Sequence, residues 1–146
     1  MWRELIGAWG TVAAFSGPAS PSDIERIEAL RLPVPPGLRD LLLESDGLRD
    51  QYGTDVVWSA SQLSEENLAA RSDGTFSELY EPFDPFVFFG DNGGGDRFAF
   101  LAEAPQDGVW VWDHETDERT RVADSLEEYL RRSLEADGED WYRGNE

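Results

Sequence analysis

The sequence predicts an α+β fold, in which a mostly antiparallel sheet is flanked by helices. Two observations predict it. Residues 86–101 hold two runs rich in aromatic and β-branched residues around a polar, glycine-rich segment, which is typical of a β-hairpin. Segments with a helical spacing of apolar residues lie before and after it. With 146 residues the chain has the size of one domain, so we expect a single domain over residues 1–146.

The hairpin at 86–101 is apolar on both faces. In its first run, Phe86 and Phe88 share one face while Val87 and Phe89 share the other. A strand with no polar face needs cover on both sides. We therefore expect the hairpin to lie centrally in the sheet, between helices and loops.

The N-terminal segment predicts two helices. The first has an apolar face, interrupted by glycines, that consists of Trp2, Leu5, Ile6, Trp9 and Val12. The second starts at Ser20, where an N-cap serine precedes Pro21 in the first turn and the capping acid Asp23. Its expected buried stripe is Ile24, Ile27 and Leu30.

A third helix is expected to open at Pro36 and to end at Gly47. Its inward residues would be Leu38, Leu41, Leu42 and Ser45. Residues 56–58 then predict a strand and residues 62–71 a short helix.

Residues 72–85 form a long loop with two prolines and no clear period. Aromatic and acidic residues alternate through it: Phe76, Glu78, Tyr80, Glu81, Phe83 and Asp84. Two interpretations stay open. The loop contacts a partner, or its aromatic residues simply cap the sheet.

The C-terminal third predicts a second hairpin, with strands at 109–112 and 120–122. Ser125 and Glu128 form a capping box that opens a last helix, whose inward residues would be Leu126, Tyr129, Leu130 and Leu134. The tail after Gly138 is polar apart from Trp141 and Tyr142.

Composition excludes several classes of function. The formal net charge is −19, and the sequence has no lysine and no cysteine. Lysine-dependent and thiolate catalysis, disulfides and cysteine-bound zinc are therefore excluded, and acidity argues against direct binding of nucleic acid. Residues 5–15 are mostly apolar but lack a positive leading segment, and no stretch is long enough to span a membrane. We expect a cytoplasmic protein.

The polar segment of the first hairpin, Asp91 to Asp96, superficially suggests a calcium loop. An EF-hand loop starting at Asp91 would need a glutamate where Ala102 stands, and phosphate binding would need a lysine that is missing. We interpret it as a wide glycine turn, with no metal and no cofactor.

No residue pattern predicts an enzyme. His114 is the only histidine, so any histidine-based acid or base step must use it, and its place in a hairpin turn predicts exposure to solvent. Paired carboxylates stay formally possible, but 31 acidic residues make such pairs uninformative. Trp58, Trp110 and Trp112 are expected in the core.

The charge is unevenly distributed. Residues 59–96 hold eight acidic residues and one arginine, so this span is the least neutralised. It combines the aromatic loop with the glycine turn, which suits the steering and docking of a basic protein. The candidate partner-binding residues are Phe76, Glu78, Tyr80, Glu81, Asp84, Asp91 and Asp96.

Four motifs, in this order and spacing, resemble the SUKH superfamily. They are LRDLLLESDG at 38–47, FGDNGGGD at 89–96, VWDHE at 111–115 and SLEEYL at 125–130, after Leu32 and Pro33. The resemblance runs from about residue 20 to 134, with the N-terminal helix and the C-terminal tail as extensions. Asp46 stands where the superfamily commonly has asparagine.

This superfamily is named after a fungal cell-wall assembly regulator and includes many bacterial immunity proteins. The resemblance implies an α+β fold and a non-enzymatic protein that binds and neutralises a polymorphic toxin domain, for which the acidity suggests a basic nuclease. The alternative is a regulatory or scaffold module with an endogenous partner. The oligomeric state and the toxin are left open.

Overall fold

The computed structural model describes residues 1–72, 80, 82–136 and 140–143. Its first half contains α1 (Trp2–Ala8), β1 (Ala13–Phe15), α2 (Pro21–Ala29), α3 (Pro36–Glu44), β2 (Leu48–Asp50), β3 (Asp55–Val57) and α4 (Ala60–Ser72). Its second half contains β4 (Phe86–Asp91), β5 (Arg97–Leu101), a 3-10 turn η1 (Pro105–Asp107), β6 (Val109–Trp112), β7 (Arg119–Ala123) and α6 (Leu126–Glu135). Within these residues the strands form two antiparallel sheets, β1-β2-β3 and β4-β5-β6-β7, which confirms the α+β class.

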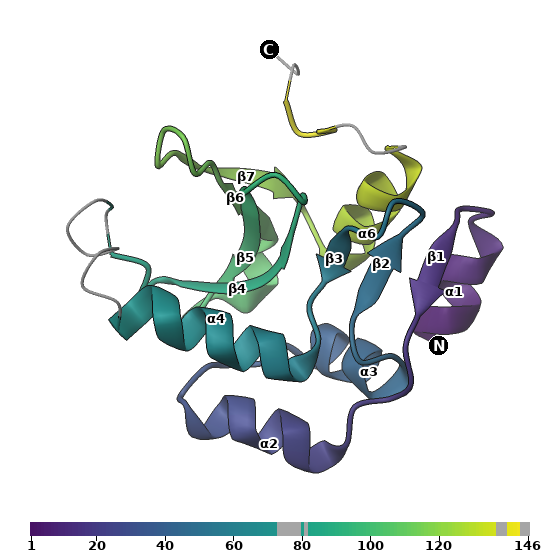
Figure 1. The fold of residues 1–146 in the computed structure, drawn as a ribbon, viewed down its shortest axis with the longest axis horizontal. Coiled ribbons are helices and arrows are strands. Elements are labelled where there is room, and N and C mark those ends of the chain that lie inside the picture. Colours follow the sequence, from purple (N-terminus) through teal and green to yellow (C-terminus); the bar gives the residue numbers. More distant parts are fainter. Residues whose placement is uncertain (73–79, 81, 137–139, 144–146) are drawn as a thin grey trace.

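The two sheets meet at β3 and β4, which run side by side (Figure 1). The N–H group of Trp58, just after β3, donates to the carbonyl oxygen of Phe89 in β4 at 2.7 Å. Because the strand order is β4-β5-β6-β7, β4 is an edge strand of its own sheet. The hairpin of β4 and β5 lies centrally in the molecule only because β3 lies alongside β4.

Both faces of this hairpin are buried, as predicted. A bulge at Phe89 interrupts the register between Phe88, which pairs with Ala99, and Gly90, which pairs with Phe98. On one face lies the main core, which includes Val87, Phe89, Phe98, Phe100, Tyr129 and Leu130. On the other lies a smaller aromatic cluster of Trp58, Phe83, Phe88 and Trp112 with Ala70 and Ala99.

The helix starts follow the predicted caps. Ser20 and Asp23 form a capping box at α2, and the Ser125 hydroxyl accepts from the N–H of Glu128 at α6. The Asp46 carboxylate accepts from the N–H of Ala60 at 2.8 Å, at the first residue of α4. Asp46 therefore helps to start the next helix.

Burial was predicted wrongly for two residues, and both lie past the end of a helix. Leu30 is 39% exposed because α2 ends at Ala29, and Val12 is 59% exposed because α1 ends at Ala8. The strands β1 and β2 were not predicted. Each has only three residues, which is too short for a sequence period to be seen.

Candidate functional site

The described part of the predicted loop packs against the aromatic cluster. The ring of Tyr80 lies edge-on to Trp112, with 5.1 Å between ring centroids, and Phe83 lies 5.1 Å from the same tryptophan. Asp84 is exposed. Phe76, Glu78 and Glu81 lie outside the described residues.

Two arginines hold the backbone at the C-terminal end of this loop. Arg71, at the end of α4, donates to the carbonyl oxygens of Asp84 and Phe86 at 3.1 and 2.9 Å. Arg119, in β7, donates to the carbonyl oxygen of Pro82 at 2.7 Å, and its guanidinium lies 4.8 Å from the centre of the Phe83 ring. These contacts fix where the loop rejoins the sheet.

Asp91, at the end of β4, is a half-buried support for the aromatic cluster. Its carboxylate accepts from the indole N–H of Trp58 and from the N–H of Gly93, both at 2.7 Å. Burial raises the pKa of Asp91 above its ordinary value, although these two hydrogen bonds oppose the shift. The predicted contact residue is thus engaged within the fold.

Asp96, at the other end of the glycine turn, is completely buried. One carboxylate oxygen contacts the ring Nδ1 of His114 at 2.7 Å, and the other accepts from the hydroxyl of Tyr142 at 2.6 Å and from the guanidinium of Arg143. Burial acts to raise the pKa of Asp96, but these hydrogen bonds together hold it below its ordinary value. Asp96 is therefore an internal anchor, and its charge is not presented on the surface.

Residues 140–143 of the C-terminal tail pack against the glycine turn, a contact that the sequence did not predict. The amide of Asn92 donates to the hydroxyl of Tyr142 at 2.9 Å. The ring of Trp141 stacks on Phe98 with 6.0 Å between centroids and an interplanar angle of 5°. The signal that could have found this contact is the aromatic pair at 141–142 in an otherwise polar tail.

His114 is paired with Asp96, which differs from the exposed turn histidine that we expected. Its Nε2 atom lies 4.0 Å from the Glu115 carboxylate, and within the described residues no hydroxyl is hydrogen-bonded to it. Among the residues that the structure describes, a base with an orienting carboxylate is present without a nucleophile beside it. This arrangement fits a structural role.

The carboxylates of Asp96 and Asp113 and the ring of His114 place three potential metal-ligand atoms within 4.8 Å of one another. The guanidinium of Arg143 already contacts Asp96 and lies 3.7 Å from Asp113. A metal ion would have to displace this cation. The cluster is therefore an ion-pair network that ties the tail to the glycine turn.

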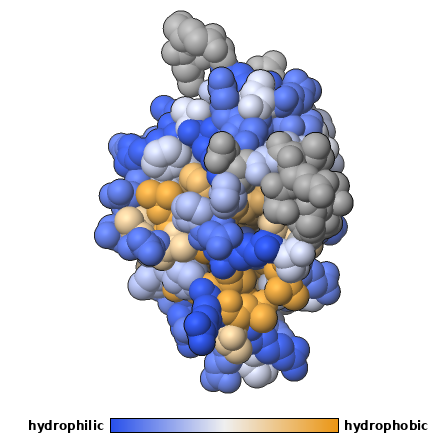
Figure 2. Space-filling view, turned by 90° about the vertical axis from the view of Figure 1, so that its left-hand side faces the viewer, coloured by the Kyte–Doolittle hydropathy of each residue, from blue (hydrophilic) through white to orange (hydrophobic). Residues whose placement is uncertain are grey.

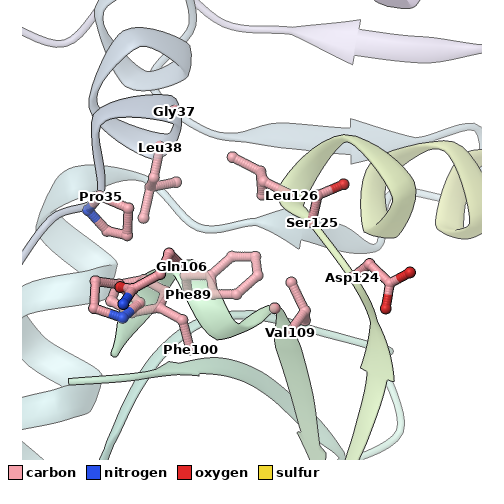
Figure 3. A pocket seen from close by; sticks show the side chains of 12 residues that line it. Pro35, Gly37, Leu38, Phe89, Phe100, Gln106, Val109, Asp124, Ser125 and Leu126 are labelled. Carbon is pink, nitrogen blue, oxygen red and sulfur yellow. The ribbon is translucent and has the colours of Figure 1, made fainter. Parts of the chain in front are cut away.

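A separate apolar pocket opens where α3, α6 and the four-stranded sheet meet (Figure 3). Leu38 and Leu126 reach into it from the two helices, and Phe89 and Phe100 reach into it from the sheet. The carboxylate of Asp124 points away from these apolar side chains (Figure 3). The pocket has a volume of about 200 Å³.

The fold and these sites define an α+β protein whose charged and aromatic contacts mainly hold loops in place. The chain matches the SMI1 / KNR4 family (SUKH-1) over residues 18–132, and it belongs to this family. No curated protein matches the chain significantly. The family match confirms the predicted resemblance, and the tail residues that bind Asp96 lie outside it.

In the part of the chain that the structure describes, no helix combines the length and hydropathy that crossing a membrane requires.

Proposed function

We propose that this protein is an immunity protein that binds and neutralises a toxin domain and has no enzymatic activity of its own. The observation that carries the proposal is membership of the SUKH-1 family, because the SUKH superfamily includes many bacterial immunity proteins and its members are generally non-enzymatic. We propose a cytoplasmic location, where an immunity protein would meet a nuclease toxin.

The charge of the chain supports a basic partner. A net charge of −19 attracts a cationic surface and raises the rate of encounter, most strongly at low salt. A nuclease that binds phosphates through lysines and arginines presents such a surface. Carboxylates of the immunity protein would then take the positions of substrate phosphates.

The proposed docking face centres on residues 72–85, which the sequence predicts to form a loop. Tyr80 and Asp84 lie at its described end, over a backbone that Arg71 and Arg119 hold in place. Figure 2 shows the side of the molecule where α4 ends, on which hydrophobic residues gather in two areas separated by hydrophilic ones. Apolar areas within a polar surround are typical of protein interfaces.

Within this face we propose Phe76 and Tyr80 as apolar anchors and Glu78, Glu81 and Asp84 as charged contacts. Asp91 contributes at the edge, because its carboxylate is only partly buried. Asp96 acts by shaping the glycine turn, because it is fully buried.

The test is binding to the toxin domain encoded nearest to the gene, by calorimetry at low and high salt, with growth rescue on co-expression. We expect tight binding that weakens strongly with salt. The triple variant Glu78→Arg, Glu81→Arg and Asp84→Arg should lose binding and rescue while it stays folded.

The matched control is Glu4→Arg, Glu25→Arg and Asp40→Arg, which changes the net charge equally at exposed positions in α1, α2 and α3. Equal loss in both triple variants would mean that only total charge matters, and the choice of face would be wrong. Absence of binding at either salt would remove that toxin and favour the alternative, a regulatory or scaffold module with an endogenous partner.

A further inference from the structure

The apolar pocket at the junction of α3, α6 and the sheet has the size of a single side chain. An apolar cavity of about 150 Å³ is enough for a benzene ring, whereas pockets for drug-sized ligands and cofactors have about 300–1,000 Å³. The pocket here has a volume of about 200 Å³. It therefore fits one aromatic or aliphatic side chain and is too small for a cofactor.

The walls of this pocket are already in place. Phe89 and Phe100 stack on each other with 5.8 Å between their ring centroids. Gly108 at the edge has a φ of 101°, and a Cβ atom there would lie 2.3 Å from the carbonyl oxygen of Ala123, so the backbone is closely packed at this point. A preformed pocket lowers the entropic cost of binding.

The surroundings of the pocket are acidic. Asp124 lines it, Asp107 lies between two lining residues, and Glu127 follows the lining residue Leu126. Two arginines lie close by. The Arg121 guanidinium is hydrogen-bonded to the carbonyl oxygen of Asp107 and to the carboxylate of Asp124, and Arg39, which follows the lining residue Leu38, is paired with Glu28. The excess of negative charge favours an apolar side chain that has basic neighbours.

We propose that this pocket receives one leucine, isoleucine, methionine or phenylalanine side chain from the partner protein, in a segment where arginine or lysine flanks that residue. The inference rests on the proposed function, because the partner is the basic protein that the chain neutralises. It adds a second contact, on the face of the four-stranded sheet opposite to the aromatic cluster that Tyr80 packs against. A few side chains that fill well-packed pockets commonly dominate the affinity of an interface.

The probe is a blocked tripeptide, acetyl-Arg-Leu-Arg-amide, titrated into the full chain while the methyl signals of Leu38, Val109 and Leu126 are followed by NMR. We expect saturable shifts at about millimolar peptide. The Arg-Ala-Arg peptide should bind at least about tenfold more weakly, because it lacks most of the apolar side chain. The Glu-Leu-Glu peptide should also bind more weakly.

Gln106→Trp tests the location, because Gln106 is an exposed lining residue whose enlargement would close the pocket without disturbing the core. The variant should abolish the shifts. Its control, Gln51→Trp, makes the same change at an exposed position between β2 and β3 and should leave them intact.

Methyl signals that do not move with Arg-Leu-Arg would overturn the proposal. Equal binding of Glu-Leu-Glu would overturn the basic flanks, and a concentration-dependent dimer that closes the pocket would show that its occupant is a second copy of the chain. These results do not depend on any toxin. Failure of the proposed function would appear as absent toxin binding by the wild-type chain, whereas a silent pocket in a chain that does bind toxin would refute this inference alone.

Discussion

The side chain of Asn67 in α4 pairs with the backbone of Phe88 in β4 as a neighbouring strand would. Its amide nitrogen donates to the carbonyl oxygen of Phe88, and its amide oxygen accepts from the N–H of Phe88, both at 2.8 Å. Asn67 is 1% exposed. One helix side chain thus satisfies the two backbone groups of a buried strand residue, immediately before the bulge at Phe89.

Replacing Asn67 should therefore be costly. Asn67→Leu keeps the size of the side chain but leaves both polar groups of Phe88 buried and unpaired. We expect a loss of about 2–4 kcal/mol in the free energy of unfolding, since each unpaired group costs about 1–3 kcal/mol. Urea denaturation measures it, with the exposed helix residue Glu65→Leu as a control that should change stability by less than about 0.5 kcal/mol. A loss in Asn67→Leu no larger than in the control would contradict the pairing.

Gly90 should not tolerate any side chain. A Cβ atom at this position would lie 2.1 Å from the carbonyl oxygen of Val56, because β3 and β4 approach closely there. Gly90→Ala should unfold the chain or cost more than about 3 kcal/mol, as overpacking against fixed backbone does. Gly94→Ala is the matched control, since its Cβ atom would meet nothing closer than 3.6 Å. Thermal unfolding of the two variants gives the answer, and similar melting temperatures would refute the close approach.

The two carboxylates that flank the glycine turn should respond differently to loss of charge. Burial disfavours the charged form of Asp91, whereas four hydrogen-bonding groups favour the charged form of Asp96. We expect Asp91→Asn to change the free energy of unfolding at neutral pH by about 1 kcal/mol or less, and Asp96→Asn to lower it by about 2–4 kcal/mol. Equal effects in chemical denaturation would contradict this assignment.

Asp96 should also make stability depend on acidity. Its pKa is lower in the folded chain than in the unfolded chain, where an aspartate has a pKa of about 3.9. The stabilisation that it provides is therefore complete above about pH 5 and is lost as the pH falls through the folded-state pKa. Stability measured from neutral pH into this acid range should fall less steeply in Asp96→Asn than in the wild type. Parallel curves would argue against a lowered pKa.

Two tyrosines should resist ionisation. Burial raises the pKa of Tyr129 well above its ordinary value, and burial together with the hydrogen bond to Asp96 raises the pKa of Tyr142. In a spectrophotometric titration, neither phenol should ionise near pH 10 while the protein remains folded. Comparison with Tyr142→Phe and Tyr129→Phe identifies the two signals. An ionisation near pH 10 that either variant removes would show that this phenol is not protected.

The sequence predicted most elements because their signals are local. The proline and capping residues at Ser20 and Ser125 mark helix starts, and the alternation in 86–101 and 109–112 marks strands. The helix ends were predicted less well, because Leu30 and Val12 lie beyond the ends of α2 and α1 and are exposed. Strands of three residues such as β1 and β2 carry too few side chains for alternation to be seen.

The site was predicted less well, because exposure and pairing depend on distant parts of the chain. Asp91 and Asp96 look alike in the sequence, yet one supports Trp58 and the other binds the tail. Asp96 and Tyr142 are 46 positions apart, and no local pattern links them.

By itself, the sequence determined the α+β class, the family and the acidity, because composition, period and motif order are properties of the chain as written. The tertiary structure decided which acids remain at the surface, how His114 is used and where an apolar pocket opens. The physical reason is that burial and hydrogen bonding depend on which segments meet, and this is fixed only when helices and sheets pack together.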